Sequence, residues 1–253
     1  MKNLKLIAAA VTVGAMLGMG VASAADLPMK ALPYTPAPPP FSWTGFYIGG
    51  HAGAGVMLDQ GFNAGAGLLD KHGIGALAGG QIGYNYQIGM LVLGIEGEGF
   101  WSGMRVTSDQ FAFSNPGTLS TINTIKNKWD YDIAGRFGIA IDHALIYGKA
   151  GWVAGNFGWN STELLFLPLP ITNGSATLNG LLIGLGLEYA FTNNWTAKFE
   201  YDYLGFGAKD VLFTTTCATC TPFTTTQSVS ADKHIFKLGF NYLFNAAPVV
   251  AKY

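Results

Sequence analysis

Apolar and polar residues alternate in many segments of this chain, and this period of two limits its fold more than any other feature. Between Leu181 and Tyr189 every odd position is large and apolar, while the even positions include two glycines and Glu188. Between Phe236 and Phe244 the even positions are apolar or aromatic, and the odd positions include a lysine and an asparagine. Successive side chains of a β-strand point to opposite faces. The alternation therefore predicts strands with one apolar face and one polar face.

Eight segments show this alternation, and each is close to the ten or so residues with which a strand crosses a membrane. Their ranges are 44–56, 74–87, 90–102, 129–141, 144–157, 177–190, 195–206 and 234–244. Short turns alternate with four longer connections, which are predicted as loops at 57–73, 103–128, 158–176 and 207–233. All eleven prolines fall outside the eight segments, as ladder hydrogen bonding requires. The pattern favours an all-β chain folded as an eight-stranded antiparallel up-and-down barrel.

Alternation alone does not decide whether the apolar face points into a soluble core or outward into lipid. Only 11% of the residues are charged, against about 25% in an ordinary soluble domain. Lys2 and Lys5 precede an apolar stretch that ends in small residues, which predicts a secretory signal cleaved between Ala24 and Ala25. Beyond it, no uninterrupted apolar stretch reaches the 18 or so residues of a membrane helix. These features together predict a transmembrane β-barrel in the outer membrane of a Gram-negative bacterium.

The remaining segments complete the expected organisation of the precursor. Residues 1–24 are the expected signal peptide, and residues 25–42 form a leader that holds six of the eleven prolines and favours extended polyproline II. The barrel is expected at 43–244, and residues 245–253 follow it as a tail. The last strand ends before the chain does. Either Phe244 or Tyr253 is therefore the terminal aromatic residue that the assembly machinery recognises.

Aromatic residues gather near the ends of the expected strands, as in the girdles of membrane barrels. The inner girdle is expected to contain Trp43, Phe46, Tyr84, Tyr86, Tyr189, Phe191, Trp195, Tyr242 and Phe244. The outer girdle is expected to contain Trp101, Trp129, Tyr131, Phe157, Trp159 and Phe206. With short turns in the periplasm, these two groups mark the boundaries of the hydrocarbon layer.

Charged residues of both signs fall on the polar face of several strands. The predicted lumen network consists of Glu96, Glu98, Asp132, Arg136, Lys149, Glu188, Lys198, Glu200, Asp202 and Lys237. Eight strands leave an interior just wide enough for side chains to fill. A plug of paired charges is therefore favoured, and a narrow ion-conducting pore is the alternative.

No motif of an enzyme or a metal site stands out in the sequence. The histidines, which are His51, His72, His143 and His234, lack the spacing of a ligand set. We expect no catalytic residue, no cofactor and no metal. Cys217 and Cys220 form a Cys-x-x-Cys in a threonine-rich loop, which outside the inner membrane predicts a disulfide, with a redox role as the alternative.

Several short motifs resemble the alphaproteobacterial outer-membrane immunogenic protein family, whose members are RopB-like, porin-like barrels of the OmpA type. The motifs are Ala-Asp-Leu-Pro from Ala25, Trp43-Thr-Gly-Phe-Tyr-Ile-Gly-Gly50, Gly79-Gly-Gln-Ile-Gly-Tyr-Asn-Tyr86, Leu93-Gly-Ile-Glu-Gly-Glu98 and Phe236-Lys-Leu-Gly-Phe-Asn-Tyr-Leu-Phe244. The resemblance spans the mature chain and implies an abundant surface antigen linked with envelope integrity and host recognition. It implies no catalytic residues.

Three roles follow as hypotheses: a structural barrel that supports the envelope and presents surface loops, a narrow porin-like channel, and a surface adhesin or receptor. The expected partners are outer-membrane lipid and lipopolysaccharide, the barrel assembly machinery through the C-terminal strand, and a host surface ligand at the long loops. Arg105, Lys126 and Lys128 are candidates for contact with lipopolysaccharide phosphates. The net charge of −1 becomes −3 without the two signal lysines, which does not favour nucleic acid.

Overall fold

The computed structural model describes residues 41–59, 72–111, 119–164, 170–218 and 220–245. The expected signal peptide with its cleavage site at Ala24 and Ala25, nearly all of the leader, and the tail after Asn245 lie outside the described residues. Within the described residues there is no helix that is long and apolar enough to cross a membrane.

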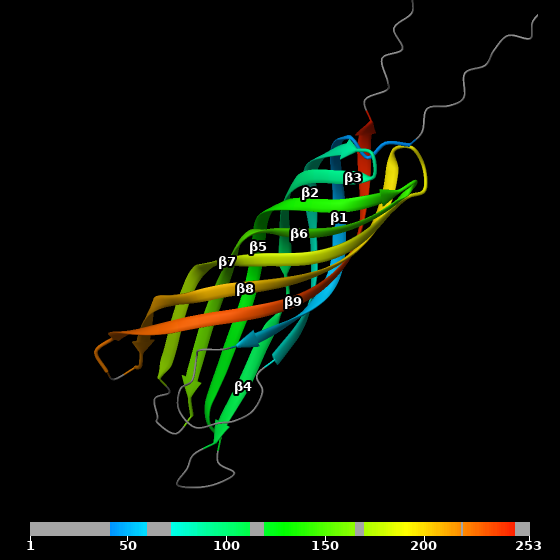
Figure 1. Ribbon diagram of the computed structural model, residues 1–253. Coiled ribbons are helices and arrows are strands. Elements are labelled where there is room, and N and C mark those ends of the chain that lie inside the picture. Colours follow the sequence, from blue (N-terminus) through cyan, green and yellow to red (C-terminus); the bar gives the residue numbers. More distant parts are fainter. Residues whose placement is uncertain (1–40, 60–71, 112–118, 165–169, 219, 246–253) are drawn as a thin grey trace, which may run out of the picture. The chain divides into compact units, whose positions relative to one another are not determined.

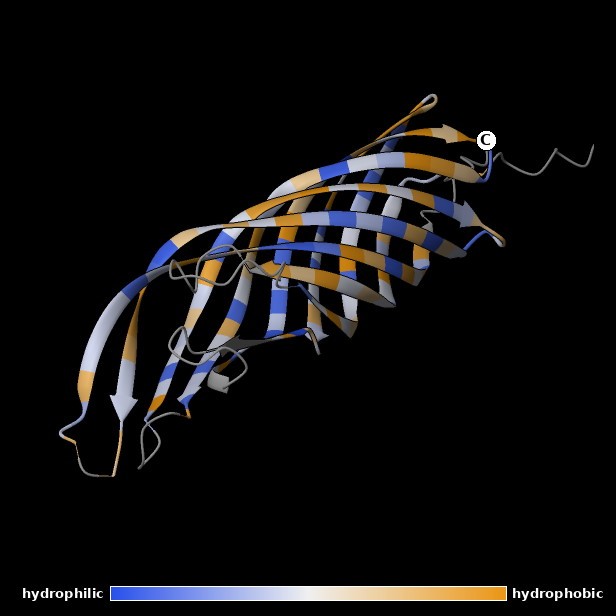
Figure 2. Ribbon diagram, turned by 90° about the horizontal axis from the view of Figure 1, so that it is seen from below, coloured by the Kyte–Doolittle hydropathy of each residue, from blue (hydrophilic) through white to orange (hydrophobic). Residues whose placement is uncertain are grey.

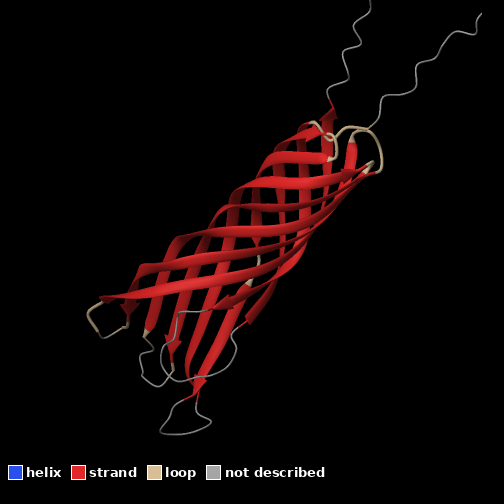
Figure 3. Cartoon of the chain, in the orientation of Figure 1, coloured by secondary structure: helices blue, strands red, loops and turns tan. Residues whose placement is uncertain are grey.

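The described residues form antiparallel strands that curve around a common interior (Figures 1 and 3). In chain order they are β1 (Gly45–Asp59), β2 (His72–Ile88), β3 (Leu91–Ser102), β4 (Arg105–Phe111), β5 (Leu119–Ile141), β6 (Ala144–Glu163), β7 (Ile171–Ala190), β8 (Trp195–Thr216) and β9 (Phe223–Asn245). β1 pairs with both β2 and β9, and β3 pairs with β5. The ring β1-β2-β3-β5-β6-β7-β8-β9 is therefore closed, and the predicted eight-stranded antiparallel fold is confirmed.

β4 is a continuation of β3 beyond a break at Gly103 and Met104, not a ninth member of the ring. Both strands pair with β5: Leu91 to Trp101 of β3 align with its inner part, and β4 aligns with its outer part. The amide of Gly103 donates to the carbonyl of Ala76 on β2, which holds the break against its neighbour.

Alternate residues of each strand point to opposite sides of the wall, as the sequence pattern predicts. On the last strand Phe236, Leu238 and Phe240 are all more than half exposed, whereas the intervening Lys237 is 1% exposed. Figure 2 shows the result as bands of hydrophobic and hydrophilic residues along the strands. Since a membrane barrel turns its apolar side toward lipid, the exposed residues form the outer wall and the buried ones the interior.

Tight turns connect the strands at the inner end of the ring. Gly89 takes a positive φ of 62° between β2 and β3, where glycine adopts the left-handed conformation without steric cost. Asp142 takes a φ of 52° between β5 and β6, a conformation in which aspartate is commoner than other side chains. These positions lie within the short connections predicted from the sequence.

At the outer end, the strands extend well beyond their predicted bounds. The loops predicted at 103–128, 158–176 and 207–233 are wrong over much of their length, because β4 to β9 occupy most of these residues. Outside hydrocarbon the outer face does not need apolar residues, so threonine, serine and lysine replace them. Many of the inward residues remain apolar: Ile125, Val211 and Phe213 are each no more than 4% exposed, although Asn123, Asn127 and Thr215 are also buried there. In the outer extension, apolar residues thus persist at inward positions, while the outward positions are no longer apolar.

Two apolar clusters lie within the barrel, one toward each end. The outer cluster includes Met57, Leu77, Phe100, Phe157, Trp159, Phe206 and Phe213. The inner cluster includes Trp43, Val92, Ala140, Leu145, Tyr147 and Ala190. Phe157, Trp159, Phe206 and Trp43 were expected in the lipid-facing girdles, so that part of the prediction is wrong. These four side chains belong to the two apolar clusters of the interior, where they pack against other buried apolar residues.

Candidate functional site

All ten residues of the predicted lumen network point into the barrel, and each is at most 5% exposed. They come from β3, β5, β6, β7, β8 and β9, so the network ties opposite sides of the wall together. Because isolated buried charges are costly, their stability depends on the pairs that they form. The pairs form two layers that are linked through Glu96.

Arg136 occupies the centre of the layer nearer the inner end. Its guanidinium donates to Glu188 at 2.8 Å and to the Tyr47 hydroxyl at 2.6 Å, and lies 3.4 Å from Glu96. The guanidinium carbon also lies 3.9 Å from the centre of the Tyr147 ring, which is a cation–π contact. Arg136 therefore connects its own strand, β5, with β1, β3, β6 and β7 through one planar group.

Three lysines form the next layer outward, and each pairs with more than one carboxylate. Lys149 lies 2.8 Å from Glu200 and 3.2 Å from Glu98. Lys237 pairs with Glu98 and lies 2.7 Å from Glu200 and 2.6 Å from Asp202. Lys198 lies 2.8 Å from Glu98. The shared carboxylates make this layer a single charge network across the lumen.

Glycines opposite the large polar side chains provide the space that the network needs. Gly186 is the cross-strand partner of Tyr147, and a Cβ atom at Gly186 would lie 2.2 Å from Cζ of that ring. Gly83 is likewise the cross-strand partner of Tyr47, and a Cβ atom at Gly83 would lie 2.3 Å from Cζ of that ring. Both tyrosines bond carboxylates, Tyr47 to Glu96 at 2.9 Å and Tyr147 to Glu200 at 2.6 Å. The abundance of glycine thus has a packing reason.

Several participants in the interior were not part of the predicted network. Tyr47 and Tyr147 are buried, and Thr196 and Asn241 donate to Glu188 at 2.5 and 2.7 Å. Farther out, Lys233 pairs with Asp130 at 2.5 Å. Their positions on the inward-facing side of the alternation would have identified Tyr47, Tyr147, Thr196, Asn241 and Asp130. Lys233 could not be found in this way, because it lies one residue before the predicted start of the last strand.

Glu96, Glu98 and Glu200 are the one described group of acidic side chains with oxygens close enough to share a metal ion, within 4.8 Å of one another. The lysine ammonium groups already occupy the space that a cation would need. Lys198 lies 3.5 Å from Glu96, 2.8 Å from Glu98 and 3.5 Å from Glu200. The trio is thus satisfied by ion pairs with the chain's own side chains.

Six carboxylates face four cations among the ten network residues, and Asp132 is the excess group that the geometry singles out. Within the described part of the chain, neither of its carboxylate oxygens has a hydrogen-bond partner. Asp202, by contrast, pairs with Lys149 at 3.4 Å and with Lys237 at 2.6 Å. Asp132 therefore contributes burial cost without the compensation that Asp202 receives.

The Asp132→Asn variant is expected to raise the free energy of unfolding by about 1 kcal/mol, since it removes an unpaired buried carboxylate. The Asp202→Asn variant, which changes the charge equally, should lower it by about 1.5–3 kcal/mol because it breaks two ion pairs. Urea unfolding of both refolded variants in lipid vesicles measures the difference. An equal loss in both variants would show that pairing does not distinguish the two sites.

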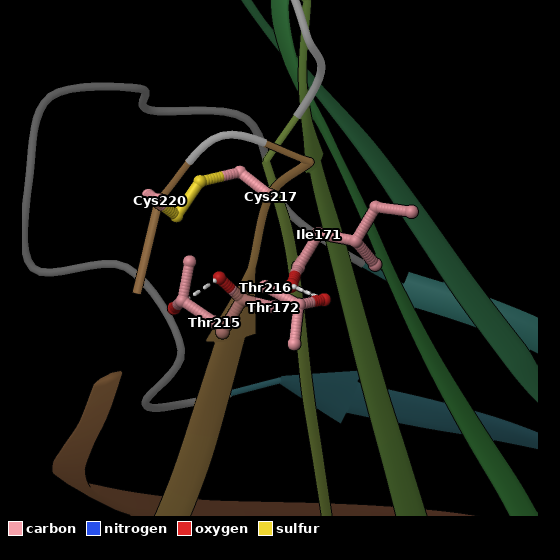
Figure 4. Close-up of a disulfide and its surroundings, with 6 residues drawn as sticks. All are labelled: Ile171, Thr172, Thr215, Thr216, Cys217 and Cys220. Atoms are coloured by element: carbon pink, nitrogen blue, oxygen red, sulfur yellow. Dashed lines mark hydrogen bonds between the residues drawn. A yellow bond between two sulfur atoms is a disulfide. The ribbon is translucent and has the colours of Figure 1, made fainter. Parts of the chain in front are cut away.

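Cys217 and Cys220 are joined in a disulfide at the outer tip between β8 and β9 (Figure 4). Beneath it, the hydroxyls of Thr172 and Thr215 lie 2.8 Å apart, and Thr216 donates to the carbonyl of Ile171 at 3.4 Å. These contacts hold β7 and β8 together at their ends without the disulfide. The cysteines are thus placed to restrain a tip, far from the charge network.

The double variant Cys217→Ser and Cys220→Ser is expected to lose less than about 2 kcal/mol of unfolding free energy, because so short a loop removes little chain entropy. The measurement is urea unfolding of oxidised wild type and variant, alongside wild type with a reducing agent. Unfolding of the barrel on reduction alone would contradict a purely local role.

A closed ring of antiparallel strands with an apolar outer wall and paired charges inside defines the class of transmembrane β-barrels of the outer membrane. The family model described as "Outer membrane protein beta-barrel domain" matches residues 12–244, and the chain belongs to this family.

Two outer-membrane proteins of similar sequence support this assignment. The chain is 33% identical over 179 residues to a "22 kDa outer membrane protein" of Rhizobium leguminosarum bv. viciae, covering 69% of this chain and 70% of that protein. It is also 33% identical over 189 residues to a "31 kDa outer-membrane immunogenic protein" of Brucella melitensis, covering 68% and 75%. A solved major outer membrane protein from Thermus thermophilus is similar with a TM-score of 0.49 and 12% identity, covering 78% of this chain and 99% of that one. The resemblance predicted from the short motifs is confirmed, and the protein is located in the outer membrane.

Proposed function

We propose that this protein is a structural element of the outer membrane, a barrel with a closed lumen that does not conduct ions and carries no enzymatic activity. The observation that carries the proposal is the lysine layer, in which Lys149, Lys198 and Lys237 span the interior and bond carboxylates of other strands. An ion that crossed this layer would have to replace several buried ion pairs at once.

The two apolar clusters support closure on both sides of the charged layers. At the inner mouth, the amide of Trp43 donates to Gln87 Oε1 at 2.7 Å, and its indole donates to the carbonyl of Asp142 at 3.3 Å. The Phe41 ring packs edge-on against Trp43 with centroids 5.2 Å apart. Toward the outer end, Lys233 lies 4.6 Å from the centre of the Phe157 ring. A water-filled path would need polar walls where these rings lie.

Single-channel recording of the refolded protein in planar bilayers tests the proposal. Insertion is verified by the difference in gel mobility between heated and unheated samples, and a sixteen-stranded porin serves as the conducting control. We expect no steady open level above the leak of the bare membrane. A reproducible open level for the wild-type protein would overturn the closed lumen and favour the narrow channel.

The ordered outer extension favours a second role, the presentation of a surface for recognition. Residues Lys209 to Thr215 of β8 pair with Phe223 to Val229 of β9 beyond the ring. Phe206 and Ala231 are cross-strand partners, so a variant with 207–230 replaced by Asn-Gly should retain a closed barrel. Binding of wild type but not of this variant to cultured host cells would support recognition, and equal binding would exclude this extension as the surface.

A further inference from the structure

A bulge on the outer wall turns a lysine outward just beyond the membrane boundary. In the ladder between β5 and β6, Asn127 lies opposite Phe157 and Trp129 lies opposite Asn156, so Lys128 has no partner of its own. Lys128 and Trp129 are consecutive, yet both are exposed. A bulge redirects a side chain in this manner, and here it adds a cation to the outer surface.

The neighbouring aromatic residues fix the height of this lysine relative to the membrane. The Trp129 ring stacks on Tyr131 with centroids 5.5 Å apart, and Tyr131 meets Trp152 edge-on at 5.5 Å. All three side chains are at least 40% exposed on the lipid-facing wall. Exposed tryptophan and tyrosine mark the level of lipid headgroups. Lys128 follows directly outward, at the level where headgroup phosphates lie.

Two more cations lie next to Lys128 on the same wall. Lys126 is exposed two residues farther out on β5, and Arg105 of β4 is its cross-strand partner and is also exposed. Residues that face one another across a ladder in this way have neighbouring Cβ atoms. The outer edge of the girdle therefore bears a group of three positive side chains.

A hollow of about 680 Å³ opens on this wall, within the size range of small-molecule sites. It is lined by Thr124, Lys126, Lys128, Gly158, Trp159, Asn160, Asn173, Gly174, Ser175, Leu212 and Thr214. Among the described residues, this lining contains two lysines, several amide and hydroxyl groups, and no carboxylate. It is suited to an anion that also carries hydroxyl groups.

A gap in the ladder accounts for the far side of the hollow. β7 and β8 are paired up to Asn173 and Thr214 and again from Gly180 and Phe206, but not between these positions. Asn160 donates to Asn173 Oδ1 at 2.7 Å, which orients both amides along the wall. The polar lining is thus a consequence of two ladder irregularities, the bulge in β5 and the gap beside β7.

We propose that this hollow binds the phosphorylated sugar headgroup of a glycolipid in the outer leaflet. Lys126 and Lys128 contact the phosphate, and Asn160, Asn173 and Ser175 contact sugar hydroxyls. The headgroup is that of a membrane lipid because the site is continuous with the aromatic girdle, so acyl chains attached to the ligand lie against the apolar wall below. This site is independent of the closed lumen, and it would remain if the barrel conducted.

Titration of the full mature protein in neutral detergent micelles with bisphosphorylated lipid A tests the proposal. The variants are Lys126→Gln with Lys128→Gln, and, as a matched control, Lys209→Gln, which removes an exposed cation of β8 that is not part of the lining and donates to the carbonyl of Thr177 at 2.9 Å. We expect the dissociation constant to rise at least tenfold in the double variant and to stay within twofold in the control. We also expect dephosphorylated lipid A to bind at least tenfold more weakly to the wild type.

Three results would overturn the site. One is a double variant that binds within twofold of wild type, and another is a control that weakens binding as much as the double variant. The third is a soluble sugar phosphate, glucose 1-phosphate, that displaces lipid A with equal affinity, because the ligand would then not be a membrane lipid. The heated and unheated gel mobilities of all variants establish that they are folded. These substitutions lie on the outer wall, so they do not change the conductance of a barrel with a closed lumen. The binding titration therefore tests the headgroup site, and the conductance measurement separately tests the closed lumen.

Discussion

The Lys237→Met variant is expected to lose about 3–5 kcal/mol of unfolding free energy, the largest loss of any single substitution considered for the interior. Lys237 pairs with Glu98, Glu200 and Asp202. Its removal leaves these carboxylates facing one another in an interior that already holds more acids than bases. Methionine fills a similar volume, so the loss reports on charge and not on a cavity.

A matched control and a partial rescue make this result specific. Lys209→Met removes an exposed lysine of the same strand pair, whose ammonium donates to the carbonyl of Thr177 at 2.9 Å, and should lower the unfolding free energy by no more than about 1 kcal/mol. Adding Glu200→Gln to Lys237→Met removes one of the carboxylates that lost an ion pair, and should recover part of the loss. The measurement is urea unfolding in lipid vesicles. If Lys237→Met is as stable as Lys209→Met, the network does not hold the barrel together.

The Leu185→Arg variant is expected to lose about 2–4 kcal/mol of unfolding free energy, the cost of a cation on the lipid face at the centre of a membrane. Leu185 of β7 is 66% exposed. It lies between Tyr189 of the inner girdle and Leu181. Leu181 is the cross-strand partner of Trp152, whose ring contacts Tyr131 of the outer girdle. An arginine at this position would point into hydrocarbon.

The control for Leu185→Arg is Leu212→Arg, which introduces the same side chain at a leucine that is 60% exposed on β8 outside the girdle. There the guanidinium would meet water, and the change should stay within about 0.5 kcal/mol. Both variants are unfolded in vesicles that span the same thickness of hydrocarbon. Equal losses at the two positions would mean that Leu185 does not face lipid.

The sequence predicts the membrane-spanning part of the fold well because lipid and lumen impose opposite demands on neighbouring residues. Leu185 and Lys237 each lie on the face that alternation assigns to them. The inner ends of the strands were also predicted within a residue or two, since turns such as that at Gly89 have recognisable composition.

The prediction of strands from the sequence fails outside the membrane, where the interior still requires particular residues but lipid no longer constrains the outer face. Beyond the girdle, Phe157 and Phe213 still face inward, but the outer face carries residues such as Lys126 and Asn173, which are equally suited to a loop. Trp43 was placed among lipid-facing aromatics because its position at a strand end fits a girdle. Only the structure shows that it folds across the inner mouth.

The sequence also does not predict which charged side chains of the interior contact one another. The alternation identifies Glu98, Asp132 and Asp202 as lumen residues. It does not show that Glu98 contacts lysines of three strands, or that Asp132 has no hydrogen-bond partner among the residues that the structure describes. The difference depends on the register and tilt of the strands. The hollow beside Lys128 depends in the same way on a bulge that the alternating pattern does not reveal.

Spin labels along β7 test most directly the central claim that the outer wall faces lipid and the interior is closed. Single cysteines at Leu181, Ile183, Leu185 and Leu187 on the outer wall, and at Leu178 and Leu182 inside, are labelled in a chain with Cys217 and Cys220 replaced by serine. Collision rates with oxygen and with a water-soluble nickel reagent are then compared in lipid vesicles. A lipid-facing wall and a closed interior predict high oxygen and low nickel access at the four outer positions, and low access of both reagents inside. High nickel access at Leu178 and Leu182 would reveal a water-filled lumen and contradict it.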